Sequence, residues 1–427
     1  MGAPATVEVT PRHYRRNFFG GLIHGVFFQL SEAFSNINTV LPAFVATLTG
    51  STIVIGLMVV AQEIGHVVPQ LVTAYHVEDR PYERPILMWI ITMRWMSWGL
   101  LAAVTALFAL DSPQAVLLLL VTLFASFSFA GGIGSIVYAD VFAKAIPTRR
   151  RGRFVGWKQL IGYALAIGAG WVVAWILDNP GRFPYPQNYA LMFGLAAVFL
   201  LIALGGIAIV KEPPSTHGRA TTSLRDSVQR ALHLTSVNPN FRRLLAARAL
   251  TGVLLLSAPF FVVFALEDVG VAQAAIGLYL AAQMTGAALS NLLWGWMGDR
   301  FGNRTVIIGA SITGLGSAVA AVAAPVVGPA TLSVTFLLVG ATMSGLRLGY
   351  ANIILEMSPD HLRATCVALL GTLIAPLALF PLAVGIVVTW IPLSVILGVD
   401  VAAMVGALAA SILVKDPRHG AAGVCIT

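Results

Sequence analysis

Long apolar runs recur along the whole chain, separated by short polar segments. We count twelve such runs, at residues 17–47, 52–76, 86–110, 114–142, 154–177, 189–210, 244–266, 272–297, 305–324, 330–356, 364–388 and 391–414. A helix needs about 20 residues to cross a hydrocarbon core about 30 Å thick, so each run is long enough to span a membrane. Backbone in lipid must satisfy its own hydrogen bonds, and the alternation expected of barrel strands is weak. The pattern therefore predicts an all-α polytopic membrane protein with twelve transmembrane helices.

Polar motifs between the runs occur twice, which predicts two similar bundles of six helices. Asp79-Arg80 followed by Arg84 matches Asp299-Arg300 followed by Arg304, and Tyr138, Pro147 and Arg151 match Tyr350, Pro359 and Arg363. The expected organisation is a tail at 1–16, a bundle at 17–210, a linker at 211–243, a second bundle at 244–414 and a tail at 415–427. Within the linker, Ser223 is suited to cap a short amphipathic helix, and a plain linker fits equally well.

Composition narrows the class of protein. Hydrophobic residues make up 58% of the chain and charged residues only 10%, whereas a soluble globular chain has about 25% charged residues. A soluble enzyme and a disordered chain are therefore both disfavoured. Two cysteines, Cys366 and Cys425, are too few for a disulfide framework or a zinc site. Metal-ligand clusters, nucleophile elbows and phosphate loops are also missing, so we expect no enzyme activity and no cofactor apart from a coupling proton.

The net charge of +8 is distributed in a way that predicts topology. If the spans alternate, twenty-one lysines and arginines fall on one side and only Arg182 falls on the other. The positive-inside rule then places both termini in the cytoplasm of a protein integral to the plasma (cell inner) membrane. We expect the lipid bilayer and a small-molecule solute as partners, no nucleic acid, and a monomer. The first apolar run is too long for a cleavable signal peptide.

Two loop motifs resemble those of a known family. Gly295, Asp299, Arg300, Gly302 and Arg304 fit the pattern G-x-x-x-D-R-x-G-x-R, which resembles the loop motif of the major facilitator superfamily. The first-half copy keeps Asp79-Arg80 and Arg84 but has Tyr82 in place of the second glycine.

A second segment, Glu356 to Arg363, looks like the same family's E-x-x-P-x-x-x-R motif. Its first-half copy has Lys144 at the position of the glutamate, with Asp140 one turn earlier. Asp140 is therefore a candidate to supply the carboxylate in place of that glutamate. The resemblance covers residues 14–414 and assigns no subfamily.

The resemblance implies two bundles that rock around a central cavity and expose it alternately to either side. Loop charges would then form a cytoplasmic gate, with candidates Asp79, Arg80, Arg84, Asp140, Arg151, Asp299, Arg300, Arg304, Glu356 and Arg363. The alternative is that these charges serve topology and solubility alone.

Polar residues inside the predicted spans are candidates for solute and proton binding. An ionisable group in a span costs about 2.5–3.5 kcal/mol on insertion scales, so each needs a partner, a wet cavity or a function. Candidates are His24, Gln29, Glu32, Asn36, Gln62, Glu63, His66, Arg347, Tyr350 and Asn352. Glu32, Glu63 and the histidines are suited to proton coupling, while a static hydrogen-bonded network joining spans 1 and 2 remains the alternative.

Two further intramembrane charges are harder to assign. The resemblance puts span 3 at the periphery, so Arg94 is expected to be structural, paired with a fixed carboxylate such as Glu63 or Glu356. Asp400 has no obvious partner in the sequence.

The combined expectation is a secondary active transporter of a small organic solute that works by alternating access and is coupled to protons. Two alternatives stay open. One is a non-transporting sensor or assembly factor with the same fold, and the other is an uncoupled uniporter or an anion exchanger using Arg347.

Overall fold

The computed structural model describes residues 11–77, 82–214, 239–358, 366, 370, 371 and 373–416. The predicted linker helix near Ser223 and the gate candidates Asp79, Arg80 and Arg363 lie outside the described residues. Within the described part the chain forms thirteen α-helices and one 3-10 helix. Nine of the described helices are long and apolar enough to cross a membrane, and two shorter apolar helices lie at Thr52–Val67 and Ala375–Val387.

The chain divides into two compact units. As far as their segments are described, unit 1 comprises Met1–Ser35, Ala61–Ala169 and Pro180–Thr221. Unit 2 comprises Asn36–Val60, Gly170–Asn179 and Thr222–Thr427. Two short pieces from the first half of the sequence, Asn36–Val60 and Gly170–Asn179, therefore belong to unit 2.

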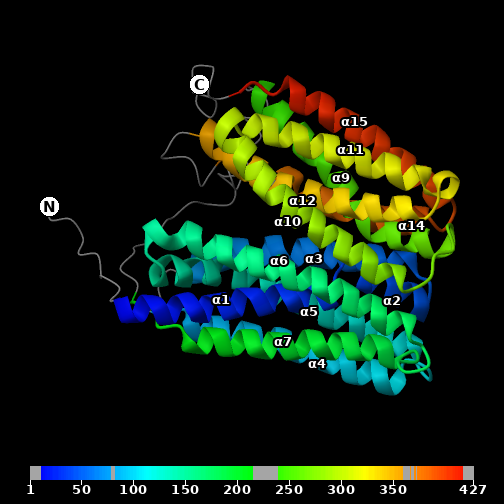
Figure 1. The fold of residues 1–427 in the computed structure, drawn as a ribbon, viewed down its shortest axis with the longest axis horizontal. Coiled ribbons are helices and arrows are strands. Elements are labelled where there is room, and N and C mark those ends of the chain that lie inside the picture. The colour runs from blue at the N-terminus through cyan, green and yellow to red at the C-terminus, as the bar shows by residue number, and fades with distance from the viewer. Residues whose placement is uncertain are drawn as a thin grey trace. The chain divides into compact units, whose positions relative to one another are not determined.

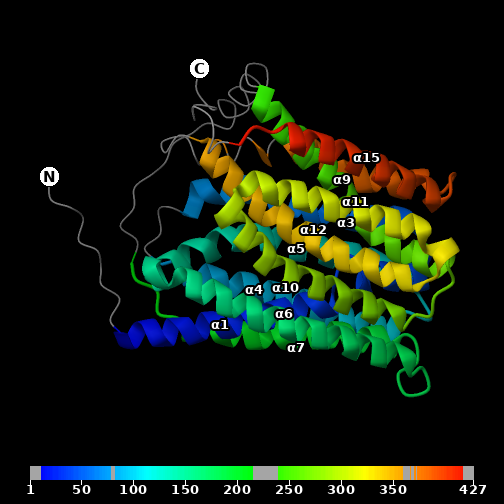
Figure 2. The ribbon, with the colours of Figure 1, turned by 45° about the horizontal axis from the view of Figure 1, so that its top comes forward.

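Unit 1 is built from six helices. They are α1 (Pro11–Phe34), the later part of α3 (Thr52–Val77), α4 (Arg84–Phe108), α5 (Pro113–Ala145), most of α6 (Thr148–Asp178) and α7 (Gln187–Ile209). Helix α7 packs against both α1 and α4, and α4 also packs against α5. Helices α1 and α7 lie side by side in both Figures 1 and 2. The approach of α1 and α7 is close because Gly206 lies against the α1 backbone at Gly20 and His24, where a Cβ would not fit.

Unit 2 holds the remaining helices. They are α2 (Val40–Leu48), α9 (Pro239–Glu267), α10 (Ala275–Phe301), α11 (Asn303–Val327), α12 (Ala330–Met357), the 3-10 helix η2 (Ala375–Leu379), α14 (Phe380–Val387) and α15 (Leu393–Leu413). Helix α12 packs against α10 and α11, and α15 packs against α9 and α11. A Cβ at Gly286 or at Gly340 would overlap the backbone of the facing helix, so glycine sets the α10–α12 distance.

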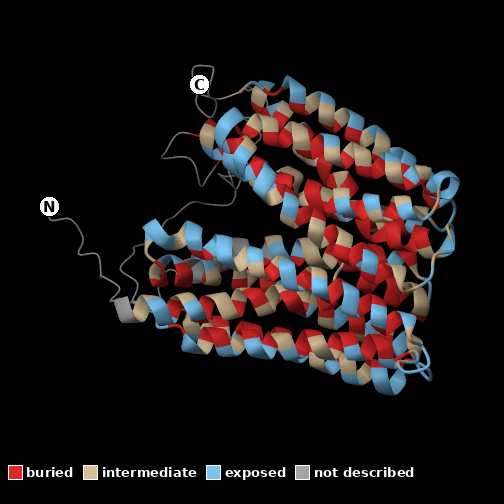
Figure 3. Ribbon diagram, viewed as in Figure 1, coloured by how far each residue is buried: buried red, intermediate tan, exposed pale blue. Residues whose placement is uncertain are grey.

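Each unit buries one face of its helices and exposes large apolar side chains on the other (Figure 3). In unit 1, Val137, Phe142 and Phe154 form part of a core near one end of the helices. Exposed apolar residues include Trp89 and Leu118, with exposed fractions of 61% and 70%. Such side chains are stable on the outside of a bundle when lipid rather than water surrounds it.

The first predicted span is not one continuous helix. Helix α1 ends at Phe34 and α2 begins at Val40, so the expectation of an unbroken helix over 17–47 is wrong. The cause is local, because the Asn36 Oδ1 accepts hydrogen bonds from the Asn38 N–H at 2.9 Å and the Thr39 hydroxyl at 3.1 Å. Asparagine side chains that bond nearby backbone in this way compete with helical hydrogen bonds.

Candidate functional site

Glu32 and Arg94 form an ion pair within unit 1. The Nη2 of Arg94 on α4 donates to the Oε1 of Glu32 on α1 at 3.1 Å. The two side chains differ in exposure, since that of Arg94 is 9% exposed and that of Glu32 is 46% exposed. A buried guanidinium therefore holds a carboxylate that solvent or a solute can reach.

Aromatic rings hold the guanidinium of Arg94 in place. Its Cζ lies 3.8 Å from the centroid of the Phe127 ring and 4.6 Å from that of Phe28. Gly131 leaves room for the group, because a Cβ there would lie 3.3 Å from the Arg94 Cζ. Contacts of a guanidinium with aromatic faces are favourable and gain strength when water is excluded. The surroundings thus fix Arg94 and leave Glu32 as the more accessible partner.

A row of polar and aromatic side chains continues from this pair along α1. His24 is buried, and its Nδ1 lies 3.2 Å from the carbonyl oxygen of Ala203. Its ring centroid is 5.4 Å from that of Tyr138, whose hydroxyl accepts a hydrogen bond from the Lys158 Nζ at 3.3 Å. His24, Phe28 and Glu32 are spaced four residues apart, so one face of α1 carries the whole row.

Several of the other polar residues predicted for the cavity in unit 1 contact groups outside the Glu32–Arg94 pair. Gln29 and Gln62 are half-buried, as is Glu63, and Gln29 lies against Gly162 of α6. His66 is exposed, with its Nδ1 3.3 Å from the carbonyl oxygen of Gln62. Asn36 belongs to the break between α1 and α2 that was described above.

In unit 2, the predicted cavity residues separate into two kinds. Arg347 and Asn352 on α12 are exposed. Tyr350 is only 3% exposed and packs into the unit's core with Phe241 and Met357, so it does not line an open surface. Its ring faces the guanidinium of Arg248 at 5.8 Å.

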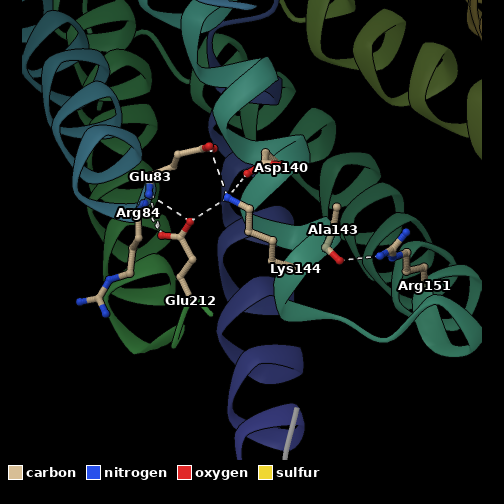
Figure 4. A network of polar contacts seen from close by, with 7 residues as sticks. All are labelled: Glu83, Arg84, Asp140, Ala143, Lys144, Arg151 and Glu212. Carbon is tan, nitrogen blue, oxygen red and sulfur yellow. Dashed lines mark hydrogen bonds and ion pairs between the residues drawn. The ribbon is translucent and has the colours of Figure 1, made fainter. Parts of the chain in front are cut away.

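Some gate candidates come together at one end of unit 1, together with residues that the motifs did not single out. Figure 4 shows the Lys144 ammonium among three carboxylates. It lies 3.3 Å from the Glu83 Oε1 and 3.5 Å from the Glu212 Oε1, and it contacts Asp140 one helical turn earlier. One oxygen of each carboxylate lies within 4.8 Å of the others.

Glu212 also binds the start of helix α4. Its two carboxylate oxygens accept hydrogen bonds from the backbone N–H of Glu83 and of Arg84, at 2.7–3.0 Å. These are N–H groups at the first turn, which have no partner inside the helix, and a negative charge is favourable there. The guanidinium of Arg84 in turn donates to the carbonyl oxygen of Val210 at 3.0 Å. The residues after α7 are thereby attached to the start of α4.

Two charged residues of this network, Glu83 and Glu212, were missed by the motif analysis. A signal existed, since Val210-Lys211-Glu212 after α7 is matched by Val414-Lys415-Asp416 after α15. Arg151, which was predicted, donates instead to backbone carbonyl groups at the end of α5, those of Ala143 and Ile146.

The corresponding end of unit 2 has a different set of contacts. The Nδ2 of Asn303 donates to the Glu356 Oε1 at 2.8 Å, and Arg304 donates to the carbonyl oxygen of Ile412 at 2.7 Å. Arg300 lies over the rings of Trp296 and Phe301, and Asp299 is exposed.

The structure supplies partners for both unassigned intramembrane charges. Arg94 pairs with Glu32, so the suggested partners Glu63 and Glu356 are not the ones that the structure shows. Asp400 on α15 is fully buried, and its Oδ1 accepts a hydrogen bond from the Ser257 hydroxyl of α9 at 2.9 Å. Asp400 thus joins two helices of unit 2.

Comparison with known proteins connects these features to a family. Residues 244–424 match the family model of the Major Facilitator Superfamily. Among curated proteins, none matches the sequence.

Solved transporter structures share the fold over nearly the whole chain. Nucleoside transporter NupG is 16% identical, with a TM-score of 0.65 over 93% of this chain and 98% of its own. A D-xylose-proton symporter is 17% identical, with a TM-score of 0.64 over 95% and 98%. A bacterial homologue of the iron transporter ferroportin, in an inward-facing state, is 15% identical, with a TM-score of 0.65 over 95% and 99%. The family match over residues 244–424, the shared fold and the long apolar helices together indicate an integral multi-pass membrane protein with the fold of these transporters.

Proposed function

We propose that this protein is a secondary active transporter that moves a small organic solute by alternating access and couples the movement to protons. The observation that carries the proposal is the asymmetric pair in unit 1. The Glu32 carboxylate is reachable, at 46% exposure, while the Arg94 guanidinium that holds it is buried. The D-xylose-proton symporter with the same fold agrees with such coupling without supplying the solute of this chain.

The pair can link proton binding to a change elsewhere. When Glu32 takes up a proton its charge is lost, and Arg94 remains as a buried cation without its counter-charge. An uncompensated buried charge is strongly unfavourable. Protonation is therefore favoured only together with a second event, either the arrival of an acceptor group on the solute or a movement of α1 relative to α4. That linkage is the basis of coupled transport.

The proposed organisation is twelve spans in two bundles of six helices, the arrangement of residues 17–210 and 244–414. Supporting it are the nine long apolar helices, with α1 and α2 together as the first span and α14 as part of the eleventh. The excess of lysine and arginine on one side of these spans supports cytoplasmic termini. A plasma-membrane location and a monomeric state are part of the same proposal.

The loop charges are proposed to act as the cytoplasmic gate. Arg84 and Asp140 lie in the network at the end of unit 1, and Arg304 and Glu356 lie at the matching end of unit 2. Asp299→Asn is expected to lower the transport rate while expression and folding stay normal. An unchanged rate would leave Asp299 with a topological role only.

The first experiment is a search for the solute by thermal unfolding. The purified protein in detergent is heated with pools of cationic, neutral and anionic solutes at two pH values. A ligand at one hundred times its dissociation constant adds about 2.7 kcal/mol to stability. We expect a hit that depends on pH in the wild type and loses that dependence in Glu32→Gln, while Glu63→Gln, at the other acidic coupling candidate of the same unit, should keep it.

The solute found in this way is then tested in proteoliposomes. An imposed pH gradient is expected to drive flux in the wild type and not in Glu32→Gln, which should still exchange solute. Gradient-driven flux in Glu32→Gln would overturn the coupling role. Flux that ignores the gradient in the wild type would identify a uniporter or exchanger, and a protein that binds partners without moving any solute would favour the sensor or assembly-factor alternative.

A further inference from the structure

Three carboxylates gather around a single ammonium group at the end of unit 1. The side chains of Glu83 and Glu212 are 3% and 2% exposed, that of Lys144 is 10% exposed, and that of Asp140 is 39% exposed. Among the described residues, every ion pair of these carboxylates is made with Lys144. If all four groups are ionised, a largely buried cluster carries an excess of two negative charges, which is costly away from water.

The basic residues on the neighbouring elements are engaged with backbone carbonyl groups instead. Arg84 of α4 donates to the carbonyl oxygen of Val210, Arg16 of α1 to that of Ile209, and Arg151 of α6 to those of Ala143 and Ile146. Lys211, beside Glu212, has an exposed side chain. Asp79 and Arg80 precede Glu83 in the sequence and lie outside the described residues. Within the described part, Lys144 is therefore the one counter-charge of the cluster.

The geometry indicates how the excess charge is reduced. One oxygen of the Glu83 carboxyl group lies within 4.8 Å of one oxygen of Asp140, and the Oε2 of Glu83 is buried and accepts no hydrogen bond from the described residues. Two carboxyl groups can bond to each other only when one of them carries a proton. We propose that Glu83 and Asp140 share one proton beside Lys144, which makes this end of unit 1 a proton-binding site separate from the Glu32–Arg94 pair.

Electrostatics support the site. Burial is the largest cause, and the Asp140 carboxylate adds to it, so that together they raise the pKa of Glu83 to about 7, against the opposing effect of Lys144. Because the pKa of Glu83 is higher in the folded protein than in the unfolded chain, the protonated form favours folding. Its contribution to stability is complete at acid pH and is lost as the pH rises through about 7.

Loss of the proton has a structural consequence. When the shared proton leaves, Glu83, Asp140 and Glu212 all carry a full negative charge. The Glu212 carboxylate accepts hydrogen bonds from the first N–H groups of α4. Like charges at this distance repel, so the attachment between the end of α7 and the start of α4 weakens above neutral pH. The pH on this side of the membrane thereby sets how firmly the segment after α7 is attached to the bundle.

The test is the pH dependence of thermal unfolding of the full chain in detergent, from about pH 4 to about pH 8.5. Glu83→Gln is a neutral isostere, and the difference in stability between the wild type and this variant should contain a step that begins at acid pH and ends near pH 7. In Asp140→Asn, which removes the neighbouring charge, the midpoint of that step should move to lower pH. Lys144→Met removes the cation and should move it to higher pH. A general loss of stability would not move the midpoint pH in opposite directions in Asp140→Asn and Lys144→Met, so these two shifts identify the shared proton.

A direct readout accompanies the stability data. Infrared difference spectra between acid and alkaline samples should contain the C=O band of a protonated carboxyl group, and Glu83→Gln should lack it. A wild-type curve parallel to that of Glu83→Gln at every pH would overturn the proposal, as would an unchanged midpoint in Asp140→Asn. Stabilisation by Mg²⁺ or Ca²⁺ that Glu83→Gln abolishes would show a metal ion in the place of the proton and would also overturn it. These variants leave Glu32 and Arg94 intact and none of the measurements requires transport, so the result is independent of the proposed proton coupling at Glu32.

Discussion

The matching ends of the two units share their backbone attachments. Arg84 in unit 1 and Arg304 in unit 2 each donate to a carbonyl oxygen at the end of a later helix, that of Val210 and that of Ile412. Asn17 exchanges hydrogen bonds with the backbone of Lys211, and Asn240 does the same with that of Lys415. These four contacts lie near corresponding helix ends in the two repeats, although their residues are not all at matching positions, so attachment at these ends is common to both units.

The charges beside these attachments differ between the two units. By the register of the repeat, Glu83 corresponds to Asn303 and Lys144 corresponds to Glu356. In unit 1 the carboxylate lies at the start of the first helix and the ammonium at the end of the next, at 3.3 Å. In unit 2 an amide donor takes the first place and a carboxylate the second, at 2.8 Å.

The difference shows what this part of the fold requires. Both units need a polar bridge between the start of one helix and the end of another, since buried polar groups are stable only when paired. The sign of the charge is free to vary. Where the bridge contains lysine, as in unit 1, additional carboxylates are tolerated around it, and among the described residues the carboxylate cluster lies in that unit. The predictions below test this distinction in order of decreasing effect.

Lys144→Met should give the largest loss. The change leaves Glu83, Asp140 and Glu212 without the cation that they share, and removal of one partner from a buried ion pair costs about 3 kcal/mol. The matching change in unit 2, Glu356→Gln, should cost less than about 1 kcal/mol because an amide can still accept the Asn303 hydrogen bond. Apparent Tm values measured in one detergent compare the two. Equal decreases in apparent Tm for Lys144→Met and Glu356→Gln would mean that the two bridges contribute equally to stability.

Replacing the Glu83–Lys144 pair of unit 1 by the Asn–Glu pair found in unit 2 should destabilise the protein unless a third residue is also changed. The double variant Glu83→Asn with Lys144→Glu puts a new carboxylate beside Asp140 and Glu212, and it should destabilise by about 2 kcal/mol. Adding Asp140→Asn, which matches Asn352 in the repeat, should recover part of that loss. The apparent Tm of the double and triple variants decides the point, and a triple variant no more stable than the double would contradict it.

Removal of Glu212 should have a smaller effect. Glu212→Ala deletes the acceptor for two N–H groups at the start of α4, a loss comparable with that of a helix cap, about 1 kcal/mol. Relief of repulsion from the neighbouring carboxylates offsets part of this cost. Hydrogen exchange of the first turn of α4 should therefore become faster, and Glu212→Gln should restore much of the protection. Unchanged exchange in Glu212→Ala would show that the carboxylate does not hold this turn.

The two arginine attachments should behave alike. Arg84→Met and Arg304→Met each remove one hydrogen bond from a guanidinium to a carbonyl oxygen, worth about 1 kcal/mol in each unit. Thermal unfolding of the two variants in parallel is the measurement. A much larger effect in one unit would show that these attachments are not equivalent, and would limit the repeat to the helices themselves.

Most helices could be predicted from the sequence, because apolar runs of sufficient length have few alternatives to a helix in lipid. The observed α4, α5, α7 and α10 follow the predicted spans to within several residues. The break after Phe34 could not be predicted in the same way. Hydrophobicity continues through Val40 and Leu41, and the break depends on hydrogen bonds of a single asparagine side chain.

The candidate site could be predicted only in part. Glu32 stood out because a carboxylate in an apolar run is costly and therefore informative. Arg94 stood out for the same reason, but its pairing with Glu32 could not be predicted, since the pair depends on α1 and α4 lying close enough for contact. Tyr350 was predicted to line the cavity because it lies close to Arg347 in the sequence. The packing of α12 instead buries Tyr350 in the core of unit 2.

The sequence by itself determined that the protein is built of membrane-spanning helices, that its halves repeat and that its loops resemble one superfamily. These properties depend on local composition and on motifs whose spacing is fixed along the chain. The tertiary structure alone decided that Glu32 binds Arg94, that Asp400 binds Ser257, and that Glu83, Asp140 and Glu212 surround Lys144. Such pairings join residues from different helices, and which helix faces settle against each other follows from packing across the whole unit.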